Sequence, residues 1–250
     1  MTENVVWQPL RDELSRWINA NRSIRFWLRD DDAVEPTDAL ERLLALSNKY
    51  EVPALLAVIP SLTGMPLAGR LKSERLTRVA VHGWSHVNHA RTGEKKQELG
   101  AHRALKTVLA ELAQGWERAR ELFPKQVLPI LVPPWNRIDI ALLPHLNSLG
   151  FAALSVFGAP KNNQTTHIPV VNTHIDLMDW HGTRGCRVHG ELVNEIVGEM
   201  RNRFDGEDST IGVLAHHLVH DESAWIFLQT LFEITAETGG CRWVSARELI

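Results

Sequence analysis

The sequence has little cysteine, no strong excess of charge and no long apolar stretch. Only two of its 250 residues are cysteines, Cys186 and Cys241, which excludes a disulfide framework. The formal net charge of -3 gives no electrostatic reason to expect nucleic acid or an anionic membrane as a partner. No apolar run approaches the roughly 18 residues of a transmembrane helix. We therefore expect a soluble globular protein with no nucleic-acid partner and no membrane span.

The N-terminal region also lacks the continuous apolar segment of a secretory signal, because charged residues interrupt it at Glu3, Arg11, Asp12 and Glu13. The cytoplasm is therefore the expected compartment. The composition does not indicate an oligomeric state.

Tryptophan is abundant instead, with nine Trp against one Tyr. Hydrophobic residues make up 44% of the chain, which is enough for a sizeable core. A length of 250 residues fits a single domain of the α/β-barrel type, and we expect one domain over residues 1–250.

Short apolar runs alternate with amphipathic helical patterns along the chain. The strand-like runs are residues 24–28, 54–59, 79–81, 127–132, 151–156, 170–173 and 211–215. The helical patterns are residues 8–20, 38–50, 94–123, 141–149, 191–204 and 223–238. We expect the helix at about residues 8–20 to pack on the outside of the domain. The alternation is typical of a mostly parallel sheet or barrel.

Polar side chains follow five of the strand-like runs. They are residues 30–32, 82–86, 135–137, 176–180 and 216–217. Each could be a solvated loop, a helix cap or a pair of histidines bonded to each other. Ligands and catalytic groups gather at the carboxyl ends of strands in parallel folds, however, and five such coincidences favour a site there.

Two histidines four residues apart, His82 and His86, are the centre of this pattern. Together with one of the aspartates they make a plausible three-ligand metal site with an open coordination position. Imidazole and carboxylate ligands favour zinc as the divalent ion.

The five motifs resemble those of the polysaccharide deacetylases, metal-dependent carbohydrate esterases that include chitin and peptidoglycan deacetylases. Residues 28–32 resemble the family's Thr-Phe-Asp-Asp-Gly, and residues 82–86 match its pair of histidines four apart. Residues 132–136 resemble Arg-Pro-Pro-Tyr-Gly, residues 176–180 match Asp-x-x-Asp-Trp, and residues 214–216 match Leu-x-His. The resemblance implies a distorted (β/α)7 barrel that hydrolyses an N- or O-acetyl group.

The resemblance also implies roles for the aspartates, in one of two registers. The preferred register makes Asp30 the general base and Asp31 the metal ligand with His82 and His86, because Asp32 lies nearest the following loop. A shift by one residue makes Asp31 the base and Asp32 the ligand.

The general acid implied by the resemblance is His216. Consecutive residues of a strand face opposite ways, so we expect His217 to point away from the site. Asp179 or Asp176 could tune the acid, and Asp179 is the preferred candidate.

The candidate substrate-binding residues are Trp84, Pro134, Trp135 and Trp180, because aromatic rings can offer flat apolar faces to a sugar. The family's arginine that tethers the catalytic aspartate is Val132 in this chain. Arg29 or Arg137 could replace it. Arg29 is favoured, because it is adjacent to the aspartates and a buried arginine needs a partner.

The sequence therefore predicts a metal-dependent hydrolase that removes an acetyl group from an acetylated sugar or sugar-containing precursor. Two alternatives stay open. One is an allantoinase-like hydrolase of another non-peptide C–N bond, and the other is a catalytically silent barrel that binds carbohydrate. A small molecule or a saccharide is the expected substrate.

Overall fold

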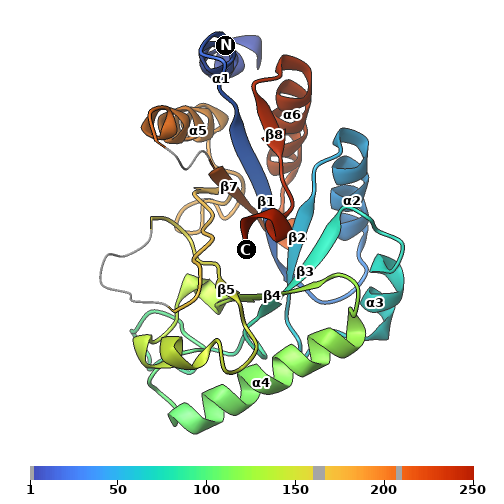
Figure 1. The fold of residues 1–250 in the computed structure, drawn as a ribbon, viewed down its shortest axis with the longest axis vertical. Coiled ribbons are helices and arrows are strands. Elements are labelled where there is room, and N and C mark those ends of the chain that lie inside the picture. Colours follow the sequence, from blue (N-terminus) through green and yellow to red (C-terminus); the bar gives the residue numbers. More distant parts are fainter. Residues whose placement is uncertain (1–2, 160–166, 207–209) are drawn as a thin grey trace.

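The computed structural model describes residues 3–159, 167–206 and 210–250, and its centre is one parallel β-sheet (Figure 1). Seven strands follow the spatial order β5-β4-β3-β2-β1-β7-β6, and β8 pairs with the beginning of β1. The strands are β1 (Ile24–Ala33), β2 (Ala54–Val58), β3 (Thr77–His82), β4 (Val127–Val132), β5 (Ala153–Leu154), β6 (Ile175–Asp176), β7 (Thr210–Ala215) and β8 (Cys241–Trp243).

The sheet curves into a barrel whose last side is irregular. Single parallel bridges join Leu154 to Val170 and Phe157 to Thr173, on the side of β5. On the other side the amide of His174 donates to the carbonyl of Gly212 in β7. Residues 170–174 thus connect β5, at one edge of the sheet, to β7. The expected distorted (β/α)7 barrel is confirmed, although residues 170–173 form bridges rather than a full strand.

Helices surround the outside of this sheet (Figure 1). They are α1 (Glu3–Asn19), α2 (Asp38–Tyr50), α3 (Met65–Leu71), α4 (Leu105–Leu122), α5 (His189–Arg203) and α6 (Glu222–Thr238). Short 3₁₀ helices are η1 (Pro134–Asn136), η2 (Ile140–His145), η3 (His217–Val219) and η4 (Ala246–Leu249). Helix α1 packs against α5 and α6, on the outside as expected, and begins earlier than the sequence pattern indicated. Within the described ranges, none of the helices has the length and apolarity needed to cross a bilayer.

The helix predicted from Glu94 begins only at Leu105. Residues 83–104 form an irregular connection in which Glu98 and Leu99 are fully buried. The apolar period that predicted a helix is carried by the residues from Leu105 onward. Among the polar residues before Leu105, Glu98 accepts hydrogen bonds from the loop that follows β3.

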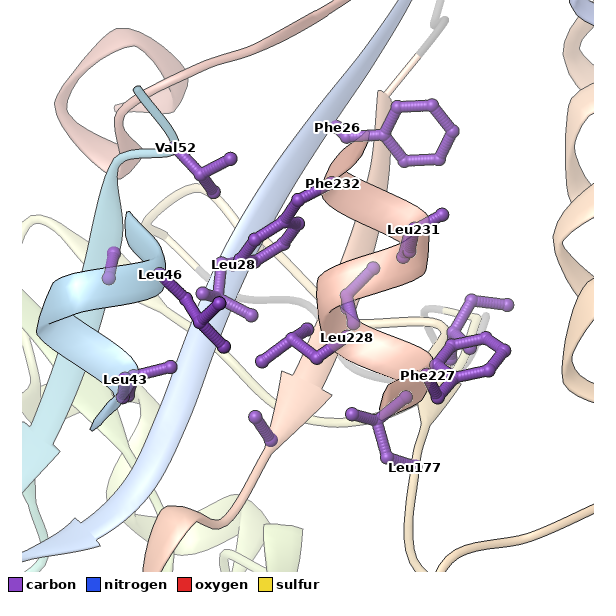
Figure 2. Close-up of a cluster of buried hydrophobic side chains, with 14 of the residues drawn as sticks. Phe26, Leu28, Leu43, Leu46, Val52, Leu177, Phe227, Leu228, Leu231 and Phe232 are labelled. Carbon is purple, nitrogen blue, oxygen red and sulfur yellow. The ribbon is translucent and has the colours of Figure 1, made fainter. Parts of the chain in front are cut away.

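Side chains alternate between an outer and an inner layer of the core. On β1, Phe26 and Leu28 pack outward against the helices, and Trp27 packs inside the barrel. Figure 2 shows the outer layer, where Leu28 lies between Leu43 of α2 and Leu228 of α6. This alternation decides which polar residues at the strand ends can reach the barrel mouth.

Candidate active site and metal centre

The three aspartates at the end of β1 point in two directions. Arg29 and Asp31 face the inside of the barrel, and Asp30 faces the outer layer. Asp32 breaks the alternation, because its φ is 74° and the pairing of β1 with β2 shifts between Asp30 and Ala33. The bulge lets two consecutive carboxylates, those of Asp31 and Asp32, reach the same barrel mouth.

Asp32 meets the two imidazoles expected to bind a metal. Its Oδ1 lies 3.2 Å from Nε2 of His82 and 3.3 Å from Nε2 of His86. The candidate ligand atoms of the three residues all lie within 4.8 Å of one another. The structure therefore brings Asp32, and not Asp31, together with the histidines. This is the second of the two registers, and the bulge is its physical reason.

The donor atoms of this cluster fit a divalent cation. Nδ1 of His82 lies 2.9 Å from the carbonyl oxygen of Val132, which can only accept a hydrogen bond. The proton of the neutral ring is therefore on Nδ1, and Nε2 turns a lone pair toward Asp32. Oδ1 of Asp32 is buried and has no hydrogen-bond partner of good geometry among the described residues. Facing lone pairs at this distance repel unless a cation or a proton lies between them, and imidazole with carboxylate is a zinc-type ligand set.

Electrostatics couple the three residues. Burial raises the pKa of Asp32, but the imidazoles of His82, His86 and His216 outweigh it and hold that pKa well below its usual range. Burial lowers the pKa of His82, but the charges of Asp31 and Asp32 outweigh this and raise it. Burial is also the main cause that lowers the pKa of His86. A proton on His82 competes with a metal ion for the same nitrogen.

The loop between the two histidines is held by Glu98. Its buried carboxylate accepts hydrogen bonds from the backbone amides of Trp84 (3.2 Å) and Ser85 (2.7 Å), and from the Ser85 hydroxyl (2.9 Å). Gly83 has a φ of 60°, and a Cβ there would collide with Glu98. This contact explains why glycine follows the first histidine. It also fixes the turn that presents His86.

A buried arginine clamps Asp31. Nε of Arg29 lies 2.9 Å from Oδ1 of Asp31, and Nη2 lies 3.0 Å from Oδ2. The guanidinium is fully buried and also donates to Asn136 Oδ1 (2.7 Å) and Ser155 Oγ (2.8 Å). The other candidate, Arg137, donates to a backbone carbonyl near the surface instead. Arg29 thus takes the position expected of a tether, but on Asp31 and not on Asp30.

Asp30 forms a buried pair with His217. The His217 amide donates to Oδ2 of Asp30 at 2.8 Å, and Nδ1 of its ring contacts Oδ1. Burial lowers the pKa of His217, but the charge of Asp30 outweighs it and raises that pKa, so the two form an ion pair. Asp30 therefore lies in the outer layer, away from the barrel mouth expected for it.

His216 faces the barrel mouth, on the opposite side of the chain from His217. Its Nε2 lies 4.0 Å from Oδ2 of Asp31, and its ring lies edge-on to Trp180 with centroids 4.7 Å apart. Nδ1 of His216 is buried and has no partner among the described residues.

The two aspartates of the fourth motif have different surroundings. Asp176 accepts hydrogen bonds from Trp180 Nε1 at 2.9 Å and from the Met178 amide at 3.0 Å. Burial raises the pKa of Asp176, and the charge of His216 opposes this. Asp179 instead caps its own turn by accepting from backbone amides that follow it, chiefly Thr183, which lower its pKa. The structure brings Asp176 close to His216 in place of Asp179, because Asp179 is committed to the turn.

Two of the four candidate substrate-binding residues flank the cluster. Trp135 has a φ of 54°, and its ring centroid lies 4.3 Å from that of His86. Trp180 is 41% exposed beside His216. Both rings leave an edge or face open at the barrel mouth.

The other two candidates lie in packed positions. Pro134 is buried, and its ring lies against Gly83. The ring of Trp84 packs near Gly115 on helix α4. They support the loops rather than line the mouth.

Sequence reasoning missed Glu98, Asn136 and Ser155. Glu98 lay inside a predicted helix, and Ser155 lay inside a predicted strand, so neither carried a signal. Asn136 did have one, because it lies in a motif that follows a strand.

Comparisons with known proteins agree with this geometry. No protein-family model matches the sequence, and a search of curated proteins found no significant match. Solved structures do match. A protein of Mycobacterium smegmatis assigned as a polysaccharide deacetylase is 14% identical with a TM-score of 0.67, over 91% of this chain and 89% of that one.

Two further matches have defined names. The chitin deacetylase of the fungus Colletotrichum lindemuthianum is 15% identical with a TM-score of 0.58, over 92% of this chain and 88% of that one. A family 4 acetyl xylan esterase of Clostridium thermocellum, solved with a cobalt ion, is 15% identical with a TM-score of 0.55, over 90% and 89%.

The chain has the polysaccharide deacetylase fold. On the motif of that fold, Asp31 and Asp32 match the pair of aspartates, so Asp30 stands where the family pattern has phenylalanine. The deacetylase pattern also has an arginine where this chain has Val132 of β4, and here Arg29 supplies a guanidinium from β1, which β2 and β3 separate from β4 in the sheet.

Proposed function

We propose that this chain is a metal-dependent hydrolase that removes an acetyl group from an acetylated saccharide. One observation carries the proposal. A metal-type cluster of Asp32, His82 and His86 shares the barrel mouth with a clamped carboxylate, Asp31, and an imidazole, His216. Hydrolysis of an acetyl group needs a base for water and an acid for the leaving group, and both types of side chain are present.

Asp32, His82 and His86 are the residues that would hold the ion, and we propose zinc. A bound divalent ion would polarise the acetyl carbonyl and lower the pKa of a water molecule. Three protein ligands leave coordination positions for both.

Asp31 is the proposed general base. It takes a proton from the attacking water, whose oxygen forms the new bond to the acetyl carbon. The ion pair with Arg29 fixes the direction of the Asp31 carboxylate, because both oxygens contact the same planar guanidinium. The bulge at Asp32, which lets Asp31 and Asp32 reach the same barrel mouth, supports this register.

His216 is the proposed general acid. When the C–N or C–O bond breaks, its imidazolium gives a proton to the leaving amine or hydroxyl, and acetate is the second product. The ring lies edge-on to Trp180, and Asp176, which accepts a hydrogen bond from Trp180, lies nearby. Trp135 and Trp180 are the proposed sugar-stacking surfaces, since they flank the two ends of the site.

The test measures metal content and acetate release with acetylated chitin oligomers and acetylated xylan. We expect about one divalent ion per chain, loss of the ion in the His82→Ala, His86→Ala double variant, and acetate release from at least one polymer. His216→Ala should keep the ion and lose about 10²- to 10⁴-fold in rate. His145→Ala, outside the site, is the matched control. Metal binding without acetate release from either polymer or from an anionic acetylated saccharide would contradict the proposal. Stoichiometric metal in the double variant would contradict the ligand assignment.

A further inference from the structure

A second hollow lies next to the Arg29–Asp31 clamp. It has a volume of about 330 Å³, within the range of roughly 300–1,000 Å³ typical of small-molecule sites. Two of its lining residues, Asn136 and Val156, accept hydrogen bonds from the guanidinium of Arg29. The hollow therefore adjoins the proposed reaction centre without including the metal cluster.

The charge of this hollow has one sign. Lys95 and Arg137 line it, and no carboxylate is found among its lining residues in the described part of the chain. Neither cation has an acidic partner within ion-pair distance among the described residues. Lys96 adds a third positive charge nearby, with its Nζ 5.9 Å from the centre of the Trp135 ring.

The remaining polar groups of the lining are already engaged. Asn172 accepts from the Val156 amide at 3.0 Å and donates to the Gly158 carbonyl at 2.7 Å. Arg137 donates through Nη1 to the Lys96 carbonyl at 2.8 Å, which holds its side chain in place. A guanidinium has five N–H donors, so Arg137 keeps donors for a ligand. The side-chain amide of Asn172 is thus used within the wall of the hollow, and Lys95 and Arg137 are available to bind a ligand.

We propose that the acetylated saccharide carries an anionic group, a carboxylate or a phosphate, which binds between Lys95 and Arg137. This inference rests on the proposed function and narrows its substrate class. Arginine matches the planar oxygen pairs of such groups, and lysine adds a mobile point charge. Ile138 and Val170 add apolar surface to the same hollow, which could contact the ring of a sugar.

The experiment compares kcat/KM for acetate release from three N-acetylated saccharides. One is neutral, one carries a uronic carboxylate, and one is a sugar phosphate. We expect at least one anionic substrate to be preferred over the neutral one. The Lys95→Gln, Arg137→Gln double variant should reduce that preference by about 10-fold or more, since each charged hydrogen bond contributes strongly to binding. The anionic substrate whose kcat/KM falls most in the double variant shows whether a carboxylate or a phosphate binds between Lys95 and Arg137.

Lys125 is exposed and does not line the hollow. Lys125→Gln is therefore the matched control and should leave the preference for anionic substrates unchanged. The preference of the wild type should also fall as salt screens the charges. Equal losses with neutral and anionic substrates would overturn the inference and leave the proposed function in place, as would a wild type that prefers the neutral sugar.

A direct binding measurement separates the two proposals. Glucuronate, inorganic phosphate and glucose are titrated into the metal-loaded protein and into the double variant. If no saccharide releases acetate, the proposed function fails, while charge-dependent binding that the double variant loses still supports the hollow as an anion site. Binding that does not distinguish either anion from glucose overturns the inference.

Discussion

Asp31 and Asp32 are adjacent in the chain, yet their surroundings give them different chemistry. Oδ1 of Asp32 is directed at Nε2 of both His82 and His86. Asp31 has both oxygens against one guanidinium. A ligand needs free lone pairs and a base needs a fixed, ionised carboxylate, so the two neighbours are not interchangeable.

We therefore expect opposite results from two isosteric substitutions. Asp32→Asn should lose the bound divalent ion, because the amide replaces a charged ligand. Asp31→Asn should keep the ion and lose about 10²- to 10⁴-fold in acetate release. Metal content is measured by elemental analysis, and the rate of acetate release is measured on the same preparations. Together they show which aspartate binds the ion and which acts as the base. An ion retained in Asp32→Asn and lost in Asp31→Asn would restore the register first preferred from sequence.

His220 gives the protein a predictable response to acid. Its Nε2 accepts a hydrogen bond from the His216 amide, and burial lowers its pKa to about 4 from the ordinary 6.5. Between these values the unfolded chain binds a proton that the folded chain refuses, so the free energy of unfolding falls as pH decreases from about 6.5 to about 4. Below that window the contribution is fully lost.

The measurement is urea unfolding of the wild type and of His220→Gln at several pH values. The difference in free energy of unfolding should shrink as pH falls through the window, because glutamine does not titrate there. The neighbouring His217 has a raised pKa and the opposite trend, but it is present in both proteins and cancels in the difference. A difference independent of pH would contradict the prediction.

At the scale of elements, the connection from β3 to α4 is organised by one buried carboxylate. Glu98 accepts three hydrogen bonds from the loop that ends at His86. Glutamine at this position would turn an NH₂ group toward donors that need an acceptor. The loop would then lose its fixed geometry while the barrel stays folded.

Glu98→Gln should therefore weaken metal binding by about 10- to 100-fold, as substitutions of outer-shell partners do. The affinity is measured by competition with a chelator. Glu117→Gln, an exposed residue of α4, is the control and should bind the ion as the wild type does. Unchanged affinity in Glu98→Gln would mean that Glu98 serves the fold and not the site.

The elements also show where sequence reasoning succeeds and where it stops. The buried strands 54–58 and 127–132 and their alternation with helices are visible because hydrophobic burial follows the local period. The helix start at Glu94 was wrong, since the polar residues before Leu105 respond to a tertiary partner, the β3 loop. The aspartate register could not be read from the period, because a single bulge at Asp32 changes which side chains face inward.

At the scale of the whole molecule, the proposed metal site joins β1 to the loop after β3, two elements separated in sequence by α2, β2 and α3. An ion bound only by the folded chain stabilises it by mass action, by about 2.7 kcal/mol when the free ion is at 100 times its Kd. For a protein of this size, each kcal/mol shifts Tm by about 2–4 °C.

Removing the ion with a chelator should therefore lower Tm by about 5–10 °C, and adding zinc should restore it. Calorimetry of the wild type and of the His82→Ala, His86→Ala double variant measures this. The double variant should show no shift. Equal shifts in both proteins would place the stabilising ion at another site.

The buried pair of Asp30 and His217 has a consequence for how this sequence can diverge. Losing either partner leaves the other as an unpaired polar group in an apolar layer, and breaking a buried pair in this way costs about 3–5 kcal/mol out of a typical total of roughly 5–15. Replacing both with well-packed apolar residues is often neutral. Asp30→Leu and His217→Leu should thus each destabilise strongly, and the double variant should recover most of the loss in urea unfolding. The two positions are therefore coupled energetically, although 187 residues separate them in the chain. In an alignment of homologues, we expect the aspartate at position 30 and the histidine at position 217 to be present together or absent together.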